Sequence, residues 1–240
     1  MVYFLQPNRG REPFLNAPPA VLGLIAVLVL AHIARVLAPG DWPDRALLDF
    51  GFIPARFSQS ADALIAAGLS PLSWPGTMFT LVSYMFVHGS FLHLTINSVW
   101  LLAFGTPVAR RFGTFKFLLF SLICGIAAAL AHLAIYWDSA APVVGASGAV
   151  SGLMAAGIRI MYGWANAMHD GPPGLAPLHA RPVLVFTALW VVTNIVAGVT
   201  GIGTSGDVTL VAWEAHLGGY FAGLFAAGLF VRGSSLPRPA

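Results

Sequence analysis

Charged residues are scarce in this chain. Of its 240 residues, only 9% are Asp, Glu, Lys or Arg, whereas 58% are hydrophobic. A soluble domain usually carries about 25% charged residues, so this composition excludes an ordinary soluble domain and indicates several membrane-spanning segments. The net charge of +3 comes from few residues, so their positions are more informative than their sum.

Cysteine is almost absent as well. The one cysteine, Cys124, lies in an apolar run, which excludes an intrachain disulfide and a thiol-based metal cluster. His169 and His179 lie in a Pro- and Gly-rich loop without a cluster of carboxylate or thiol partners. We therefore expect no bound metal, and no feature of the sequence predicts a nucleic-acid partner.

Long apolar runs dominate the rest of the sequence. A helix needs roughly 20 apolar residues to cross a bilayer, and six segments qualify: about Ala20–Ala38, Leu92–Val108, Phe115–Tyr136, Ser147–Tyr162, Val183–Gly201 and Trp213–Val231. The first is too long for a signal-peptide core and is interpreted as a retained span. The prediction is an all-α polytopic membrane protein with a membrane domain at residues 20–231 and short tails at 1–19 and 232–240.

A long segment, Pro39–Ser90, separates the first two spans. It is too polar, and too often interrupted by Pro and Gly, to cross the membrane. Its short amphipathic pieces and its Trp and Phe residues predict a first loop that lies in the membrane interface. A glycine-rich stretch between the last two spans, "GIGTSGDVTLVAW", is interpreted as a mobile lid.

The basic residues indicate the orientation. If six spans alternate, one side of the membrane receives most of them: Arg9, Arg11, Arg110, Arg111, Lys116, Arg159, Arg181, Arg232 and Arg238. The other side receives most of the acidic residues. Because Lys and Arg are enriched in cytoplasmic loops, both termini are predicted to be cytoplasmic, in a multi-pass protein of a bacterial inner membrane.

Several polar side chains fall inside the predicted spans, where they are costly and mark functional sites by default. In this orientation the second, fourth and sixth spans all run from the outside inwards. His93, Asn97, Ser147 and His216 then share one depth, in the outer leaflet. Convergence of four polar groups from three distant segments is a stronger signal than any one of them.

The four residue types suit nucleophilic catalysis. A serine hydroxyl becomes a good nucleophile when a histidine takes its proton. Ser147 opens a helix, whose free N–H groups and dipole favour negative charge, as in an oxyanion hole. His93 and Asn97 are four residues apart and project from one helix face.

No acidic residue lies within the spans at this depth, so a third member of a triad is not evident. Glu214 is expected to point away from His216 and to sit in the interface. His88, His132 and Asn194 are interpreted as structural residues.

Each of these features, taken alone, can be explained by helix packing without any catalytic role. Gly148 and Gly152 form a small-xxx-small pair that by itself indicates helix packing, and intramembrane His or Asn residues often bond neighbouring helices. Packing alone, however, does not require a serine at a helix start, a histidine at the same depth and two donors beside them.

Three stretches together carry a family resemblance: "HGSFLHLTINSVWLLAFG", "GASG" and "AHLGGYFAG". In this order and spacing they resemble the signatures of the rhomboid intramembrane serine proteases. The resemblance implies a six-helix rhomboid-like bundle with Ser147 as nucleophile, His216 as base and His93 and Asn97 at the oxyanion. It also implies structural glycines at Gly145, Gly148, Gly219 and Gly223.

The implied function is an intramembrane serine endopeptidase without metal or cofactor. Its partners would be the lipid bilayer and single-pass or multi-pass membrane-protein substrates, cut in or next to a transmembrane segment by a site open to the outer side. Two alternatives remain: an inactive rhomboid-like protein that binds membrane clients, and a small transporter. The chain lacks the internal repeats that transporters usually show, and both Ser147 and His216 are present.

Two positions depart from the family pattern. Many members carry a Trp-Arg pair before the second span, where this chain has Phe79 and Thr80. Some members carry an aromatic residue four positions after the serine, stacked on the base. Here that position is Ser151, so the base must be oriented in another way.

Overall fold

The structure, a computed structural model, describes residues 16–170, 174–200 and 212–231, and for residues 164–170 it describes the backbone only. The described chain is all-helical, apart from one isolated bridge between Phe52 and Val143. The residues outside the described ranges include Arg9, Arg11, Arg232 and Arg238. They also include 201–211, most of the segment 201–213 that is interpreted as a lid. The side chain of His169 lies outside the described part too.

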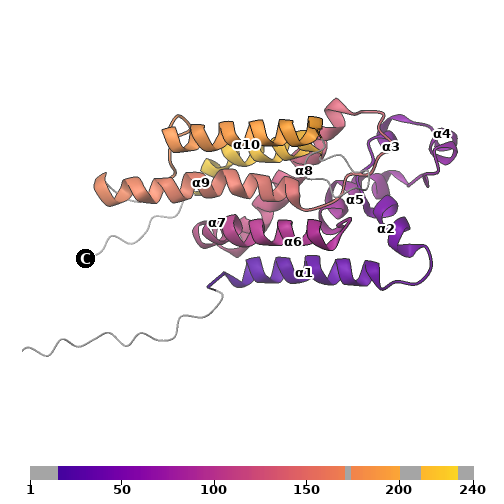
Figure 1. The fold of residues 1–240 in the computed structure, drawn as a ribbon, viewed down its shortest axis with the longest axis horizontal. Helices are drawn as coiled ribbons and strands as arrows, with labels where there is room; N and C mark the ends of the chain where they lie inside the picture. Colours follow the sequence, from indigo (N-terminus) through magenta and orange to yellow (C-terminus); the bar gives the residue numbers. More distant parts are fainter. Residues whose placement is uncertain (1–15, 171–173, 201–211, 232–240) are drawn as a thin grey trace, which may run out of the picture.

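Long helices form a bundle of nearly parallel rods (Figure 1). Five segments are long and apolar enough to cross a membrane: α1 (Pro19–Val36), the segment Phe91–Phe112, α8 (Thr114–Ile135), α10 (Arg181–Thr200) and α11 (Trp213–Val231). The sixth expected segment forms α9 (Ser147–Asp170), which lies in the middle of the bundle in Figure 1. Its small and polar residues lower its hydropathy, so it does not count among the five. The chain is therefore a polytopic helical membrane protein.

The second span is a composite of three pieces. It consists of α6 (Phe91–Trp100), a π-helical turn, η2 (Leu101–Gly105), and α7 (Thr106–Phe112). Pro107 lies in the first turn of α7, and a proline has no N–H to offer the preceding turn. The backbone adopts the wider π spacing just before that proline, as helices often do where the regular ladder is interrupted.

The first loop folds into short helices at one end of the bundle (Figure 1). They are α2 (Trp42–Phe50), α3 (Ala55–Ser58), α4 (Ala61–Ala66), α5 (Trp74–Ser83) and the 3₁₀ turn η1 (Tyr84–Phe86). Ser60 and Ser73 cap α4 and α5 by accepting backbone N–H bonds at 3.3 and 3.4 Å. Trp42 and Trp74 are exposed, as aromatic residues at a membrane interface commonly are.

Backbone hydrogen bonds join this loop to the segment before α9, among them a reciprocal pair between Phe52 and Val143. Phe52 N–H donates to the Val143 carbonyl at 3.0 Å, and Val143 N–H donates back at 2.8 Å. Arg56 donates to the Leu48 carbonyl at 2.8 Å from a buried position. Burial lowers the pKa of this guanidinium, while the charge of Asp49 acts in the opposite direction. The loop therefore forms part of the fold at the end where α9 begins.

Glycines allow α8, α9 and α11 to approach closely. A methyl group added to Gly219 would overlap the backbone of Gly148, and one added to Gly223 would overlap that of Gly152. A methyl on Gly152 would also overlap the side chain of Cys124 on α8. In lipid, helices associate through such close van der Waals packing, because lipid tails are as apolar as the side chains.

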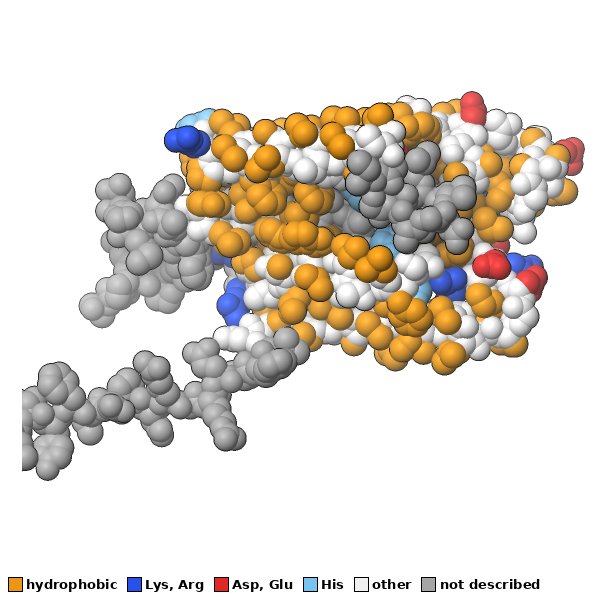
Figure 2. Space-filling model, viewed as in Figure 1, with side chains coloured by type: hydrophobic (Ala, Val, Ile, Leu, Met, Phe, Trp, Pro, Cys, Tyr) orange, Lys and Arg blue, Asp and Glu red, His pale blue; other side chains and the backbone are white. Residues whose placement is uncertain are grey.

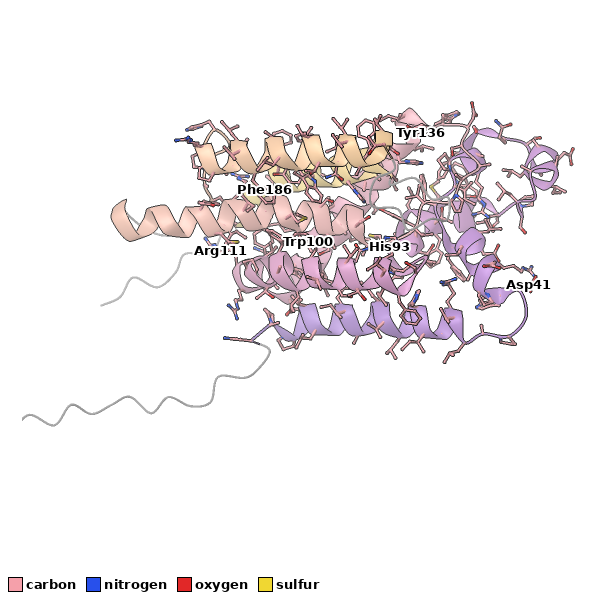
Figure 3. The ribbon with its side chains drawn as sticks, viewed as in Figure 1. Asp41, His93, Trp100, Arg111, Tyr136 and Phe186 are labelled. Carbon is pink, nitrogen blue, oxygen red and sulfur yellow. The ribbon has the colours of Figure 1, made fainter. Side chains whose placement is uncertain are left out.

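The charges are distributed unequally between the two ends of the bundle. Arg110 on α7 bonds the backbone of Asn16, just before α1, and Lys116 on α8 donates to the Phe230 carbonyl on α11 at 3.3 Å. The start of α1 and the end of α11 therefore lie at the same end. Acidic side chains gather at the opposite end, and apolar side chains cover the belt between (Figure 2). Asp41 and Arg111 mark these two ends in Figure 3.

Candidate active site

Ser147 is the first residue of α9, at the end of the bundle where the first loop folds. The two residues before it are fixed from the connection between α5 and α6. Gly145 N–H donates to the Tyr84 carbonyl at 2.9 Å, and Ala146 N–H donates to Nε2 of the buried His88 at 3.4 Å. The interpretation of His88 as a structural residue agrees with this contact.

The imidazole of His216 lies directly against Ser147. Its Nε2 is 2.7 Å from the Ser147 Oγ. His216 lies in the first turn of α11, and the glycine contacts between α9 and α11 bring the two helix starts within side-chain reach. The structure therefore places the predicted nucleophile and base in hydrogen-bond contact, which is the geometry that base activation of a serine requires.

Asn194 on α10 lies on the other side of the imidazole. Its Oδ1 is 2.7 Å from the Nδ1 of His216, and the side chain is buried. The sequence interpretation, that Asn194 only packs, is therefore incomplete. One feature of the sequence pointed towards this contact, namely the depth of Asn194 in the membrane. The fifth span runs outwards, so Asn194 falls in the outer part of the predicted membrane, as His216 does.

His93 and Asn97 approach the chain just before Ser147. A Cβ built on Gly145 would lie 2.6 Å from the His93 Nε2 and 3.8 Å from the Asn97 Nδ2. Gly145 also has a φ of +111°, a conformation that side chains disfavour. Glycine is needed here on both counts, and Figure 3 shows His93 at the end of α6 that adjoins the start of α9.

The amide of Asn97 has a defined orientation. It donates one N–H to the His93 carbonyl at 3.0 Å, and the side chain is buried. A primary amide has a second N–H. The first turn of α9 adds backbone N–H groups that have no intrahelical acceptor. Side-chain donors therefore lie beside Gly145, and backbone donors lie in the first turn of α9 that Ser147 opens.

Glu214 has a partner that the sequence did not predict. It is buried, and its Oε1 lies 2.6 Å from the Nδ1 of His132 on α8, not against His216. The buried His132 explains the contact, because a polar side chain inside the bundle needs a partner. The pair ties the start of α11 to the end of α8, two residues before His216.

The structure shows which contacts form at the two positions that depart from the family pattern. Ser151 Oγ donates to the Ser147 carbonyl at 2.7 Å, while the hydrogen bonds of the imidazole go to Asn194 and Ser147. The ring of Trp190 on α10 lies 6.5 Å from the His216 ring, tilted by 34°. At the other departure Phe79 is exposed, and the buried Thr80 donates to the Thr77 carbonyl at 2.7 Å.

A separate cavity of about 390 Å³ lies between α1 and the first-loop helices, lined by residues that include His32, Arg35, Phe50 and His88. Ser147 and His216 do not line it. Among the described residues, no three His, Cys, Asp or Glu side chains converge in a way that could hold a metal ion.

Comparison with known proteins agrees with the fold. Residues 75–233 match the model of the Rhomboid domain family. The chain is 31% identical over 163 residues to the rhomboid protease GlpG of Serratia proteamaculans. The matched region covers 65% of this chain and 51% of that protein. It is 28% identical over 173 residues to the rhomboid protease GluP of Bacillus subtilis, covering 71% of this chain and 30% of that protein.

The family model spans well over half of the chain, so the chain belongs to the rhomboid family. The chain spans about half the length, or less, of the curated relatives that it matches.

Proposed function

We propose that this protein is an intramembrane serine endopeptidase in which Ser147 is the nucleophile and His216 the base. The observation that supports this most directly is the distance of 2.7 Å between the Ser147 Oγ and the His216 Nε2. The names of the curated relatives, all rhomboid proteases, support the same activity.

The geometry suggests the following chemistry. The Ser147 Oγ attacks the carbonyl carbon of a substrate peptide bond while His216 takes the hydroxyl proton. The oxyanion that forms accepts hydrogen bonds from the first N–H groups of α9, from the free N–H of Asn97 and from His93. His216 then donates its proton to the leaving amine, and the C–N bond breaks.

Water completes the cycle. The acyl group remains on Ser147 as an ester until His216 takes a proton from a water molecule, which attacks the same carbon. Collapse of the second intermediate releases the new carboxyl group and returns the proton to Ser147. Water reaches such a site only through a polar-walled opening, which we propose lies on the outer side, where the first-loop helices fold.

The proposed substrates are single-pass or multi-pass membrane proteins. Their transmembrane helix would be locally unstable and carry a small residue at the cut, so that an extended strand can reach Ser147. No metal or cofactor takes part in this scheme.

Single substitutions of the two residues test the proposal. Ser147→Ala and His216→Ala should each abolish cleavage of a model transmembrane substrate, and the double variant should be no worse, because residues that act as one unit are not additive. Ser151→Ala removes a hydroxyl one turn away and should leave substantial activity. A fluorophosphonate probe should label the wild type and not Ser147→Ala.

The outcome also separates the alternatives. A client-binding protein would bind substrate without reacting with the probe, and a transporter would do neither. Cleavage by Ser147→Ala, together with its loss in Ser151→Ala, would contradict the proposed nucleophile.

A second proposal concerns topology: both termini are cytoplasmic and the site opens to the outside. Cysteines introduced as Gly10→Cys and Leu236→Cys should be protected from an impermeant thiol reagent in intact cells, whereas Ala140→Cys should react. Labelling of both termini from outside would overturn the orientation and the shared outer depth of the polar residues.

A further inference from the structure

Asn194 forms a contact that helix packing does not require. On α10 only Val183 and Asn194 are buried, and most of the large apolar side chains of this helix face outward. A buried amide is costly unless its hydrogen bonds are made. Here Nδ2 donates to the Trp190 carbonyl at 2.8 Å, and Oδ1 faces the Nδ1 of His216 at 2.7 Å.

These two contacts define the tautomer of the imidazole. Because Nδ2 is engaged with a carbonyl, which accepts only, the group facing His216 is the amide oxygen. An amide oxygen also accepts only, so Nδ1 must be the protonated nitrogen. The lone pair then lies on Nε2, which faces the Ser147 Oγ at 2.7 Å. This is the tautomer that a general base needs.

The structure also explains why another residue has to orient the base. The position four residues after Ser147 is a serine, whose hydroxyl donates to the Ser147 carbonyl. The ring of Trp190 lies 6.5 Å from the imidazole and is tilted by 34°, so the two rings are not stacked. Among the described residues, Asn194 is the partner bonded to Nδ1.

We infer that Asn194 is a positioning residue for the base, so that the proposed site is a Ser147–His216–Asn194 series with a neutral third member. This inference rests on the proposed function. The amide fixes the direction and tautomer of the imidazole before substrate binds. It carries no charge to stabilise the imidazolium, so its effect should be smaller than that of a carboxylate.

The chain offers a matched control for a merely structural role. Thr187 on α10 is 2.9 Å from the Tyr220 hydroxyl on α11, so this pair also ties the two helices together. It lies apart from the dyad and belongs to none of the proposed chemistry. Thr187→Val removes the hydrogen bond between Thr187 and Tyr220. Asn194→Leu removes the hydrogen bond between Asn194 and His216 at nearly constant side-chain volume.

The experiment measures kcat and KM on a model transmembrane substrate, the rate of labelling by a fluorophosphonate, and thermal unfolding in detergent. Asn194→Leu should lower kcat and the labelling rate about 100-fold, the loss that a misplaced catalytic group typically causes, with KM nearly unchanged. Asn194→Asp, which keeps an acceptor oxygen, should recover much of that loss. Thr187→Val should change unfolding as much as Asn194→Leu does, with kcat close to wild type.

Wild-type kcat in Asn194→Leu, an equal kcat loss in Thr187→Val, or an aspartate variant no better than the leucine one would each overturn the inference. Failure of the proposed function itself looks different: Ser147→Ala would then still cleave, or the wild type would not react with the probe.

Discussion

On the side of Ser147 that faces α11, backbone meets backbone: Gly219 and Gly223 leave no room for a methyl group against Gly148 and Gly152. On the side that faces α6, side chains approach instead, with His93 and Asn97 beside Gly145. Glycines occur on both sides for different reasons. Towards α11 they set how far apart two helices lie, and towards α6 one glycine makes room for two hydrogen-bonding side chains.

This difference separates two kinds of mutational effect. Changes at the glycine contacts with α11 should act on stability first, because they alter helix packing. Changes on the α6 side should act on turnover first, because the side chains there are proposed to bind charge that develops only in the transition state. The predictions below test this division, beginning with the largest expected effect.

Asn97→Ala should lower kcat by about 10²–10³, the typical cost of one oxyanion donor, while unfolding and KM change little. Ser98→Ala is the matched control, because Ser98 also bonds the carbonyl four residues back on α6, at 2.8 Å, and should retain near-normal turnover. Steady-state kinetics with thermal unfolding in detergent make the measurement. Full turnover in both Asn97→Ala and His93→Ala would leave the backbone N–H groups as sufficient donors.

Glu214→Leu should lower the free energy of unfolding by about 3 kcal/mol, because it leaves the buried His132 without its partner. Turnover should fall with the folded fraction. Glu214→Gln retains an acceptor oxygen for His132 and should lose less than half as much. An unchanged unfolding transition in the leucine variant would show that the pair does not anchor the start of α11.

Gly219→Ala should destabilise the protein by about 2 kcal/mol, because its methyl group would overlap the backbone of Gly148. Gly228→Ala, on the same helix with no neighbour within 4 Å, should be neutral or slightly stabilising. Thermal unfolding of both variants measures the contrast. If the two behaved alike, close backbone approach would not hold α9 against α11.

The sequence predicts most of the fold because membrane spans have a strong local signature. Apolar runs located the helices to within a few residues, except that α9 runs on past Tyr162 to Asp170. The shared depth of Ser147 and His216 predicted their proximity, since depth follows from the order and direction of the spans. The roles of the site residues stay predictions until the variants are measured.

Pairings within one depth could not be predicted in this way. An isolated asparagine in an apolar span has the same local pattern whether it packs or bonds a base. The depth of Asn194 matches that of His216, but depth alone does not show that the two side chains meet. The burial of Glu214 against another helix could not be predicted for a related reason. Its partner, His132, lies 82 positions away on α8, and only the packing of α8 against α11 brings the two together.

The burial of Cys124 has a practical consequence for work on this membrane protein. Its side chain is 0% exposed and rests against Gly152, so a replacement at this position would disturb the contact between α8 and α9. A water-soluble maleimide has no route to that sulfur while the bundle is intact. The native chain therefore serves as its own unlabelled background, and single reporter cysteines, spin labels or fluorophores can be introduced elsewhere without first making a cysteine-free variant.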